Sequence, residues 1–270
     1  MAHARPSEIL PKAVASLEKA LSLDPGLADA HCSLGVLENT YRWNSEACRQ
    51  SLARCLELDP GNAPGRCEYG VSYLTPLGRL EEARGWLLEA HELDPLSPQI
   101  LVWLGLNAWS LNQGELCLSH VRQAVKLDPH CLFAHVGIAI ASFVLERWDE
   151  TEAAIAAAHA SSPPINMNLI EAWIRAKQGR TGKARQLLKE VLALEGREYF
   201  SESHVASIFA VLGERAQAWQ WMEKAMASRD PGVRQIGVSP WFRDWAQDPA
   251  WPELLEKVRL PRSAGTAGAG

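Results

Sequence analysis

The sequence has no surplus of basic residues, no apolar run long enough to cross a bilayer, and no apolar stretch after Met1 that would mark a secretory signal. Its 27 Lys and Arg stand against 32 Asp and Glu, so the net charge is -5. This balance argues against nucleic-acid binding, because phosphate groups need a basic surface. The longest apolar stretch, from Cys131 to Leu145, covers 15 residues and fits a buried helix better than a membrane span.

Cysteine is scarce as well. The 270 residues include six cysteines, and no two of them stand in a Cys-x-x-Cys spacing. We therefore expect no disulfide framework and a reducing, cytoplasmic compartment. Hydrophobic residues, at 47%, are numerous enough to build a core, which excludes a wholly disordered chain.

Catalytic motifs are also missing: the chain has no Gly-x-Ser-x-Gly, His-Glu-x-x-His or Gly-x-Gly-x-x-Gly. Residues 179–184 resemble a phosphate-binding loop only faintly, because Ala184 stands where Ser or Thr would hold magnesium. Cys131 and His135 could share a metal ion, but His135 occupies the same repeat position as His31, which favours a packing role. We expect no catalytic residue, no metal and no cofactor, and hence no enzyme.

What the sequence does contain is a repeat of 34 or 35 residues. Its marks are the prolines of four Asp-Pro pairs and one further proline: Pro25, Pro60, Pro95, Pro129 and Pro163. A small, a large and a second small residue recur with i, i+4, i+7 spacing, which predicts one face of an amphipathic helix. The seven copies of this triplet are Ala13-Leu17-Ala20, Cys48-Leu52-Cys55, Ala83-Leu87-Ala90, Cys117-Val121-Ala124, Thr151-Ile155-Ala158, Ala184-Leu188-Val191 and Ala218-Met222-Ala225.

A second helical segment precedes most of these triplets, with a pair such as Leu34-Gly35 or Leu104-Gly105 near its centre. Proline then ends each unit, because it cannot continue a helix. A pair of antiparallel helices cannot bury its apolar face alone, so the units are expected to stack on one another.

This pattern resembles the tetratricopeptide repeat family over residues 7–261. The resemblance implies an all-α fold, a right-handed α-solenoid of stacked helix-turn-helix repeats with a C-terminal capping helix. We expect an array over residues 7–232, made of a half-repeat at 7–27 and about six full repeats. A C-terminal cap over 233–261 and a disordered tail over 262–270 follow.

The two ends of the array carry further expectations. The chain opens on the second helix of a unit, so one face of the helix at 7–23 is predicted to be uncovered. The ending from Ser239 to Leu255 is similar to the tails of tetratricopeptide regions in multidomain bacterial signalling proteins. That similarity implies that the array is part of a larger signalling protein.

In this family the first helices of the units line a concave groove that binds partners. Transferring the repeat phase assigns to the groove the partner-binding residues Val102, Leu106, Trp109, Phe133, Val136, Ile140, Phe143, Ile170 and Ile174. These side chains are apolar and aromatic. The lysines and asparagine that clamp a carboxylate in chaperone-binding members are absent, since Cys32 and Val36 stand at the corresponding positions of the first full unit.

The leading hypothesis is a non-catalytic protein-interaction scaffold that binds an apolar peptide or helix of another protein in this groove. One alternative is a sensory module that holds a small ligand and controls an attached effector domain. Another is a structural array that self-associates through its N-terminal end or its groove. Truncating Trp109 or Phe143 should then weaken binding and spare the fold, and Glu152 should lie on the solvent-exposed outer face.

Overall fold

The protein is described by a computed structural model over residues 6–161 and 164–262, without the side chains of residues 164–166. The regular secondary structure of the described part is all helical, with no strand. Pro163 and the expected disordered tail from residue 263 onward lie outside the described residues. None of the described helices is both long and apolar enough to cross a lipid bilayer.

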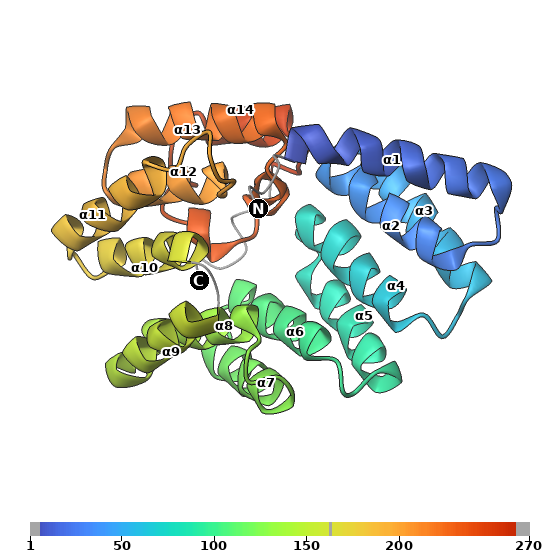
Figure 1. The fold of residues 1–270 in the computed structure, drawn as a ribbon, viewed down its shortest axis with the longest axis horizontal. Helices are drawn as coiled ribbons and strands as arrows, with labels where there is room; N and C mark the ends of the chain where they lie inside the picture. The colour runs from blue at the N-terminus through green and yellow to red at the C-terminus, as the bar shows by residue number, and fades with distance from the viewer. Residues whose placement is uncertain (1–5, 162–163, 263–270) are drawn as a thin grey trace.

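Each full unit is a pair of antiparallel helices, as the repeat predicts. The first helices are α2 (Ala28–Thr40), α4 (Ala63–Glu68) with its extensions η1 (Tyr69–Leu74) and η2 (Thr75–Leu77), α6 (Pro98–Ser110), α8 (Leu132–Val144), α10 (Pro164–Lys177) and α12 (Glu202–Val211). The second helices are α1 (Pro6–Leu23), α3 (Ser45–Leu58), α5 (Leu80–Leu93), α7 (Gly114–Leu127), α9 (Trp148–Ser161), α11 (Thr181–Leu192) and α13 (Arg215–Ser228). Figure 1 shows them following one another along a curved path.

The predicted triplets form the packing core between the helices of each unit. Leu52, Leu87 and Val121 are completely buried, as are the small residues that flank them in α3 and α5. Small residues let the paired helices approach closely, and the large central residue fills the space between them. The equivalent residues of α1, which no described first helix precedes, stay half-buried.

The Asp-Pro turns close each unit through their own side chains. The Asp24 carboxylate accepts a hydrogen bond of 2.8 Å from the Gly26 amide, and Asp128 accepts one of 2.9 Å from His130. One turn into the next helix, an imidazole reaches back to the proline carbonyl: Nε2 of His135 lies 2.8 Å from the Pro129 oxygen. The predicted structural role of His135 therefore has a hydrogen-bonding basis.

The second full unit departs from the expected geometry. Its first helix widens into the π-helical turn η1 at Tyr69–Leu74, which takes up one extra residue. Gly78, with φ of 76°, then ends the helix in the left-handed region that glycine favours.

An ion-pair network joins α9 to α10 and includes Glu152, which is exposed, as expected. The Arg175 side chain is 7% exposed, and its Nη2 donates a 2.7 Å hydrogen bond to Oε2 of Glu152. Nε of Arg175 also donates to Oε1 of Glu171 at 3.1 Å, and Nε2 of His159 lies 3.0 Å from Glu171 Oε2. Glu152 therefore holds two helices together and is not a free surface residue.

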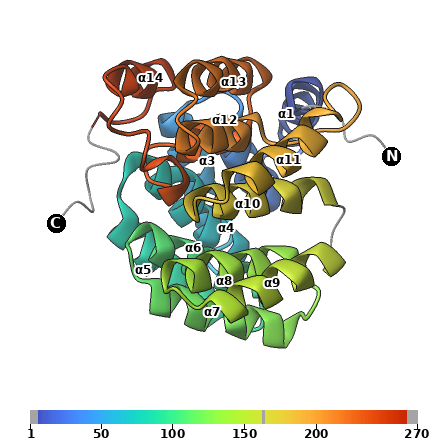
Figure 2. The same cartoon turned by 90° about the vertical axis from the view of Figure 1, so that its left-hand side faces the viewer.

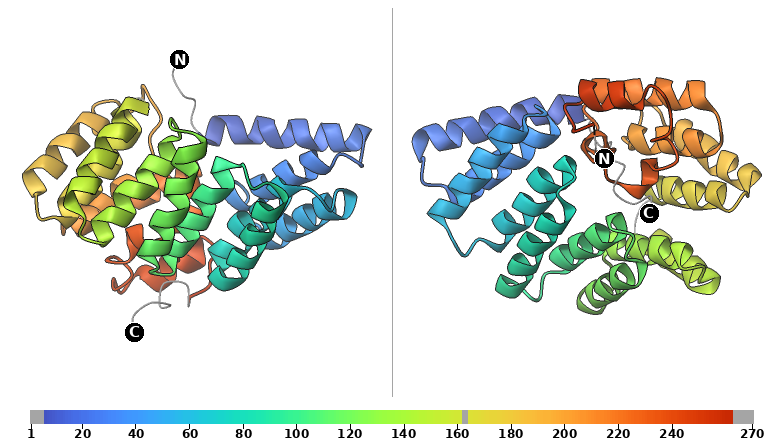
Figure 3. Two further views of the ribbon diagram at one scale, coloured as in Figure 1. Left: turned by 90° about the horizontal axis from the view of Figure 1, so that it is seen from below. Right: turned by 180° about the vertical axis from the view of Figure 1, so that it is seen from behind.

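The chain after α13 forms the short turns η3 (Pro231–Gln235) and η4 (Pro240–Phe242) and then helix α14 (Trp251–Lys257). Trp251, Leu254 and Leu255 of α14 are buried. Figure 2 shows α14 beside α13 at the end of the array, and the right-hand view of Figure 3 shows the preceding residues on the inner side of the curve. Residues 231–260 are called the C-terminal segment below.

Candidate protein-interaction surface

The inner side of the array is crossed by the C-terminal segment. The centre of the crossing is Trp241, which is 7% exposed. Its ring centroid lies 4.5 Å from that of Trp173 in α10 and 6.1 Å from that of Trp109 in α6. His204 of α12 lies 4.8 Å away on another side. Aromatic pairs at these separations contribute beyond simple burial, so three different units hold one tryptophan.

Polar contacts of Arg243 and Asp244, just after Trp241, fix the segment to the array. Nη1 of Arg243 donates a 2.5 Å hydrogen bond to Oδ1 of Asn112, just after α6. Nζ of Lys177, at the end of α10, donates to Oδ2 of Asp244 at 2.8 Å. The C-terminal segment therefore spans from α10 to α6 across the inner side.

The Arg234 side chain joins the C-terminal segment to the first full unit of the array. Its guanidinium is completely buried and donates from Nε to Oδ1 of Asn39 at 2.9 Å and from Nη2 to Oγ of Ser45, also at 2.9 Å. Its Nη1 donates to the Val258 carbonyl at 2.5 Å. Burial, partly offset by Cys48, lowers the pKa of Arg234 to about 10.

A cation–π contact strengthens this closure. The guanidinium carbon of Arg229, at the end of α13, lies 3.8 Å from the ring centroid of Trp43, in the turn between α2 and α3. Residues of the first full unit and of the last thus touch directly, and the array is closed on itself.

The nine groove residues assigned from the repeat phase fall into three groups. Five are buried: Val102, Trp109, Val136, Ile140 and Ile174. Three are half-buried against the same core: Leu106, Phe143 and Ile170. Phe133 is 58% exposed. The expected open surface at Trp109 is thus replaced by a covered one, because Trp241 and Trp173 lie against its ring.

Sequence reasoning assigned Trp241 to the cap and missed its position on the inner side. It also missed Arg234 and Asn39 as a pair. Both residues that the C-terminal segment contributes here lie outside the repeat, so no periodic signal marks them. The only available hint was the density of tryptophan after residue 240, where three of the eleven occur.

Several titratable groups near this surface are buried, and burial disfavours their charged forms. Burial lowers the pKa of the His204 imidazole, and the Asp230 carboxylate opposes that shift. Burial likewise raises the pKa of the thiols of Cys32 and Cys48 to about 12, which leaves them protonated and unreactive at neutral pH. Among the described residues no group of three or more His, Cys, Asp or Glu could hold a metal ion.

These features define an α-solenoid of stacked helix pairs, and the expected all-α solenoid fold class is confirmed by its match to tetratricopeptide repeat structures. A structure of a tetratricopeptide repeat protein from Parabacteroides merdae is similar to it with a TM-score of 0.61 and 16% identity, over 93% of this chain and 92% of that one. No family model and no curated protein matches the sequence.

Two further solved structures share the fold. PilW, described as a type IV pilus biogenesis factor, gives a TM-score of 0.58 at 16% identity, over 74% of this chain and 90% of its own. Yeast Tom70 gives a TM-score of 0.58 at 15% identity, over 97% of this chain and 57% of its own. Identities this low establish the shared fold and no shared partner.

Proposed function

We propose that this chain is a non-catalytic protein-interaction scaffold that binds an apolar segment of a partner protein on the inner side of its array. The observation that carries the proposal is the seat of Trp241. An irregular segment with one aromatic anchor is held there by side chains of α6, α10 and α12. A surface that holds such a segment within the chain has the shape and chemistry to hold one from another chain.

The proposed partner-binding residues divide according to what the C-terminal segment leaves accessible. Phe133, Phe143, Ile170 and Leu106 keep accessible surface and would make the first contacts with a partner. A partner can reach the five buried groove residues only where the C-terminal segment moves away from them. On this proposal the C-terminal segment occupies part of the binding surface within the same chain. A partner then either binds next to it, along α8, or displaces Trp241.

A peptide added in trans tests the proposal. The full chain carrying Trp241→Ala and Arg243→Ala lacks the two side chains that tie the segment to α6. A fluorescent peptide with the sequence of residues 236–250 should bind this variant, measured by anisotropy, and should bind the parent chain much more weakly. The same peptide with alanine at the position of Trp241, and with Trp245 kept, is the control and should not bind.

Two results would overturn the proposal. One is a folded variant, checked by circular dichroism, that fails to bind the peptide. The other is equal binding of the parent and control peptides, because the aromatic anchor would then contribute nothing.

The place of the array within a larger bacterial signalling protein remains a proposal supported by the ending at residues 239–255. The cytoplasmic location remains one too, supported by the cysteine usage of the sequence. Neither enters the binding experiment.

A further inference from the structure

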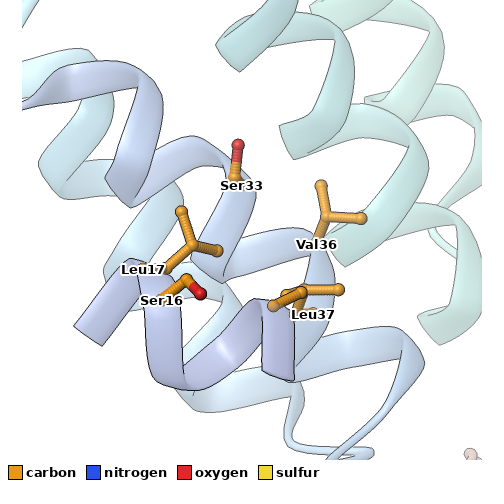
Figure 4. Close-up of a pocket in the computed structure, with 6 residues that line it drawn as sticks. Ser16, Leu17, Ser33, Val36 and Leu37 are labelled. Atoms are coloured by element: carbon orange, nitrogen blue, oxygen red, sulfur yellow. The ribbon is translucent and has the colours of Figure 1, made fainter. Parts of the chain in front are cut away.

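A shallow apolar hollow lies between α1 and α2, away from the seat of Trp241. Figure 4 shows its lining: Ser16 and Leu17 come from α1, and Ser33, Val36 and Leu37 come from α2. Ala13 completes the α1 wall, and the volume is about 490 Å³.

The repeat shows what occupies the equivalent place in the other units. Leu17 is the large residue of its triplet, and its counterparts Leu52 and Val121 are completely buried under a first helix. In those units a glycine of the first helix faces the large residue. A Cβ built on Gly35 would lie 2.7 Å from Cγ of Leu52, and one on Gly105 would lie 2.7 Å from Cγ1 of Val121. Leu17 is only half-buried, and no described first helix precedes α1 to cover it.

The α2 wall is also less covered than its counterparts. Leu37 is half-buried. Its counterparts in the next two units, Ser72 and Asn107, are 5% exposed each, although both are polar. Both lie against the second helix of the preceding unit: Nδ2 of Asn107 donates to the Leu80 carbonyl of α5, and the Ser72 carbonyl accepts a hydrogen bond from the Cys48 thiol of α3. Both walls of the hollow are therefore less covered than the equivalent surfaces of the next units, and the hollow has the position of a binding site for one α-helix.

Positively charged side chains beside the hollow indicate what kind of helix would bind there. Lys12 and Lys19 lie one turn before and one turn after Ser16, so helical spacing places both on the side of α1 that borders the hollow. Both are exposed, and neither forms an ion pair within the described part of the chain. Glu18, on another side of α1, is already paired with Arg42 at 2.7 Å.

We propose that this hollow binds an amphipathic α-helix of another protein. The bound helix presents a glycine or alanine to Leu17 and acidic side chains to Lys12 and Lys19. It continues the layer of first helices by one member, with a length like that of α2 and α6, 13 residues each. A second copy of this chain is a poorer occupant, since pairing two α1 helices would bring like-charged lysines together.

The probe for this site is a synthetic helix of about 18 residues, long enough to be partly helical alone. It carries a leucine and alanine stripe, one central glycine, and two glutamates seven residues apart on one flank. Fluorescence anisotropy should show it binding to the full chain. Reversing both charges, Lys12→Glu with Lys19→Glu, should weaken binding about tenfold, and added salt should shrink that difference.

Two matched controls isolate the site. Lys183→Glu with Lys189→Glu reverses two exposed lysines on α11 and should leave the affinity unchanged. A probe with leucine in place of its central glycine should bind about tenfold more weakly, because the helices could no longer approach closely at Leu17.

The proposal is overturned if the parent chain does not bind the probe, or if the Lys12 and Lys19 reversal changes nothing. A concentration-dependent dimer of the parent chain that the Leu17→Gln change abolishes would also overturn it, by assigning the hollow to a second copy. The peptide of residues 236–250 tests the other surface, so either proposal can fail alone.

Discussion

Arg234 and Asn39 are 195 residues apart in the chain, and Nε of the one donates a 2.9 Å hydrogen bond to Oδ1 of the other inside the closed array. The guanidinium has no exposed surface, and its other two nitrogens also donate, to Ser45 and to the Val258 carbonyl. Solenoids usually leave their first and last units apart. Here one side chain joins them.

Arg234→Ala should therefore destabilise the fold by about 3 kcal/mol, because it leaves buried acceptors on Asn39 and Val258 without donors. Arg234→Lys should not restore stability, since one ammonium cannot reach three separate acceptors in the geometry of a guanidinium. Urea unfolding measures both. Small-angle scattering should show the alanine variant to be more extended, and an unchanged radius of gyration would contradict the closing role.

Trp109 and Phe133 were assigned the same partner-binding role from the repeat phase, and they should now behave differently. Trp109 is 5% exposed and packs against both Trp173 and Trp241, so Trp109→Ala should cost about 3–5 kcal/mol of stability. Phe133 is 58% exposed, and Phe133→Ala should leave the melting temperature nearly unchanged. Thermal unfolding of the two variants tests this difference. Equal melting temperatures would show that Trp241 contributes little to the packing of the inner surface.

The difference between these two residues shows where prediction from the sequence reaches its limit. The triplets are local: Leu52 is four residues from Cys48 and three from Cys55, so their shared face follows from helical geometry alone. The cover over Trp109 comes from residue 241, in a segment with no repeat phase, and the partner of Arg234 lies in the first full unit. Such long-range contacts depend on the curvature of the whole array, which no local spacing encodes.

Glu152→Lys should destabilise the protein, although Glu152 is exposed. It would place a second positive charge against Arg175, which is 7% exposed and depends on Glu152 and Glu171 for its hydrogen bonds. The Glu152 side chain is itself 47% exposed, so solvent reduces the effect to about 1–2 kcal/mol. Glu92→Lys on α5, also exposed, is the control for the same charge change. Equal melting temperatures for the two variants would contradict the structural role of Glu152.

Asp248 should make the stability of the folded protein decrease at acid pH. Hydrogen bonding from Arg215 lowers the pKa of this carboxyl to about 2, with further donors in the Ala250 amide and the Trp219 indole. A carboxyl whose pKa falls on folding stabilises the folded state above its unfolded pKa, near 3.9, and loses that contribution as the pH falls toward 2. The parent should therefore lose more stability between pH 5 and pH 2 than Asp248→Asn, measured by urea unfolding at each pH. Parallel pH profiles would rule out this linkage.

Glycine-to-alanine changes at two helical positions test the close packing of the units. They are expected to change the stability of the protein in opposite directions. A Cβ on Gly105, in α6, would lie 2.7 Å from Cγ1 of Val121 and 3.4 Å from the Cys117 carbonyl oxygen. Gly105→Ala should therefore cost about 1–3 kcal/mol, because Val121 is completely buried and the helices must move apart. Gly85, in α5, is exposed and has nothing within 4 Å of the same position, so Gly85→Ala should stabilise the protein by about 0.5–1 kcal/mol through higher helix propensity. Urea unfolding of both variants gives the two signs, and a stabilising Gly105→Ala would mean that α6 and α7 are not in the close contact described.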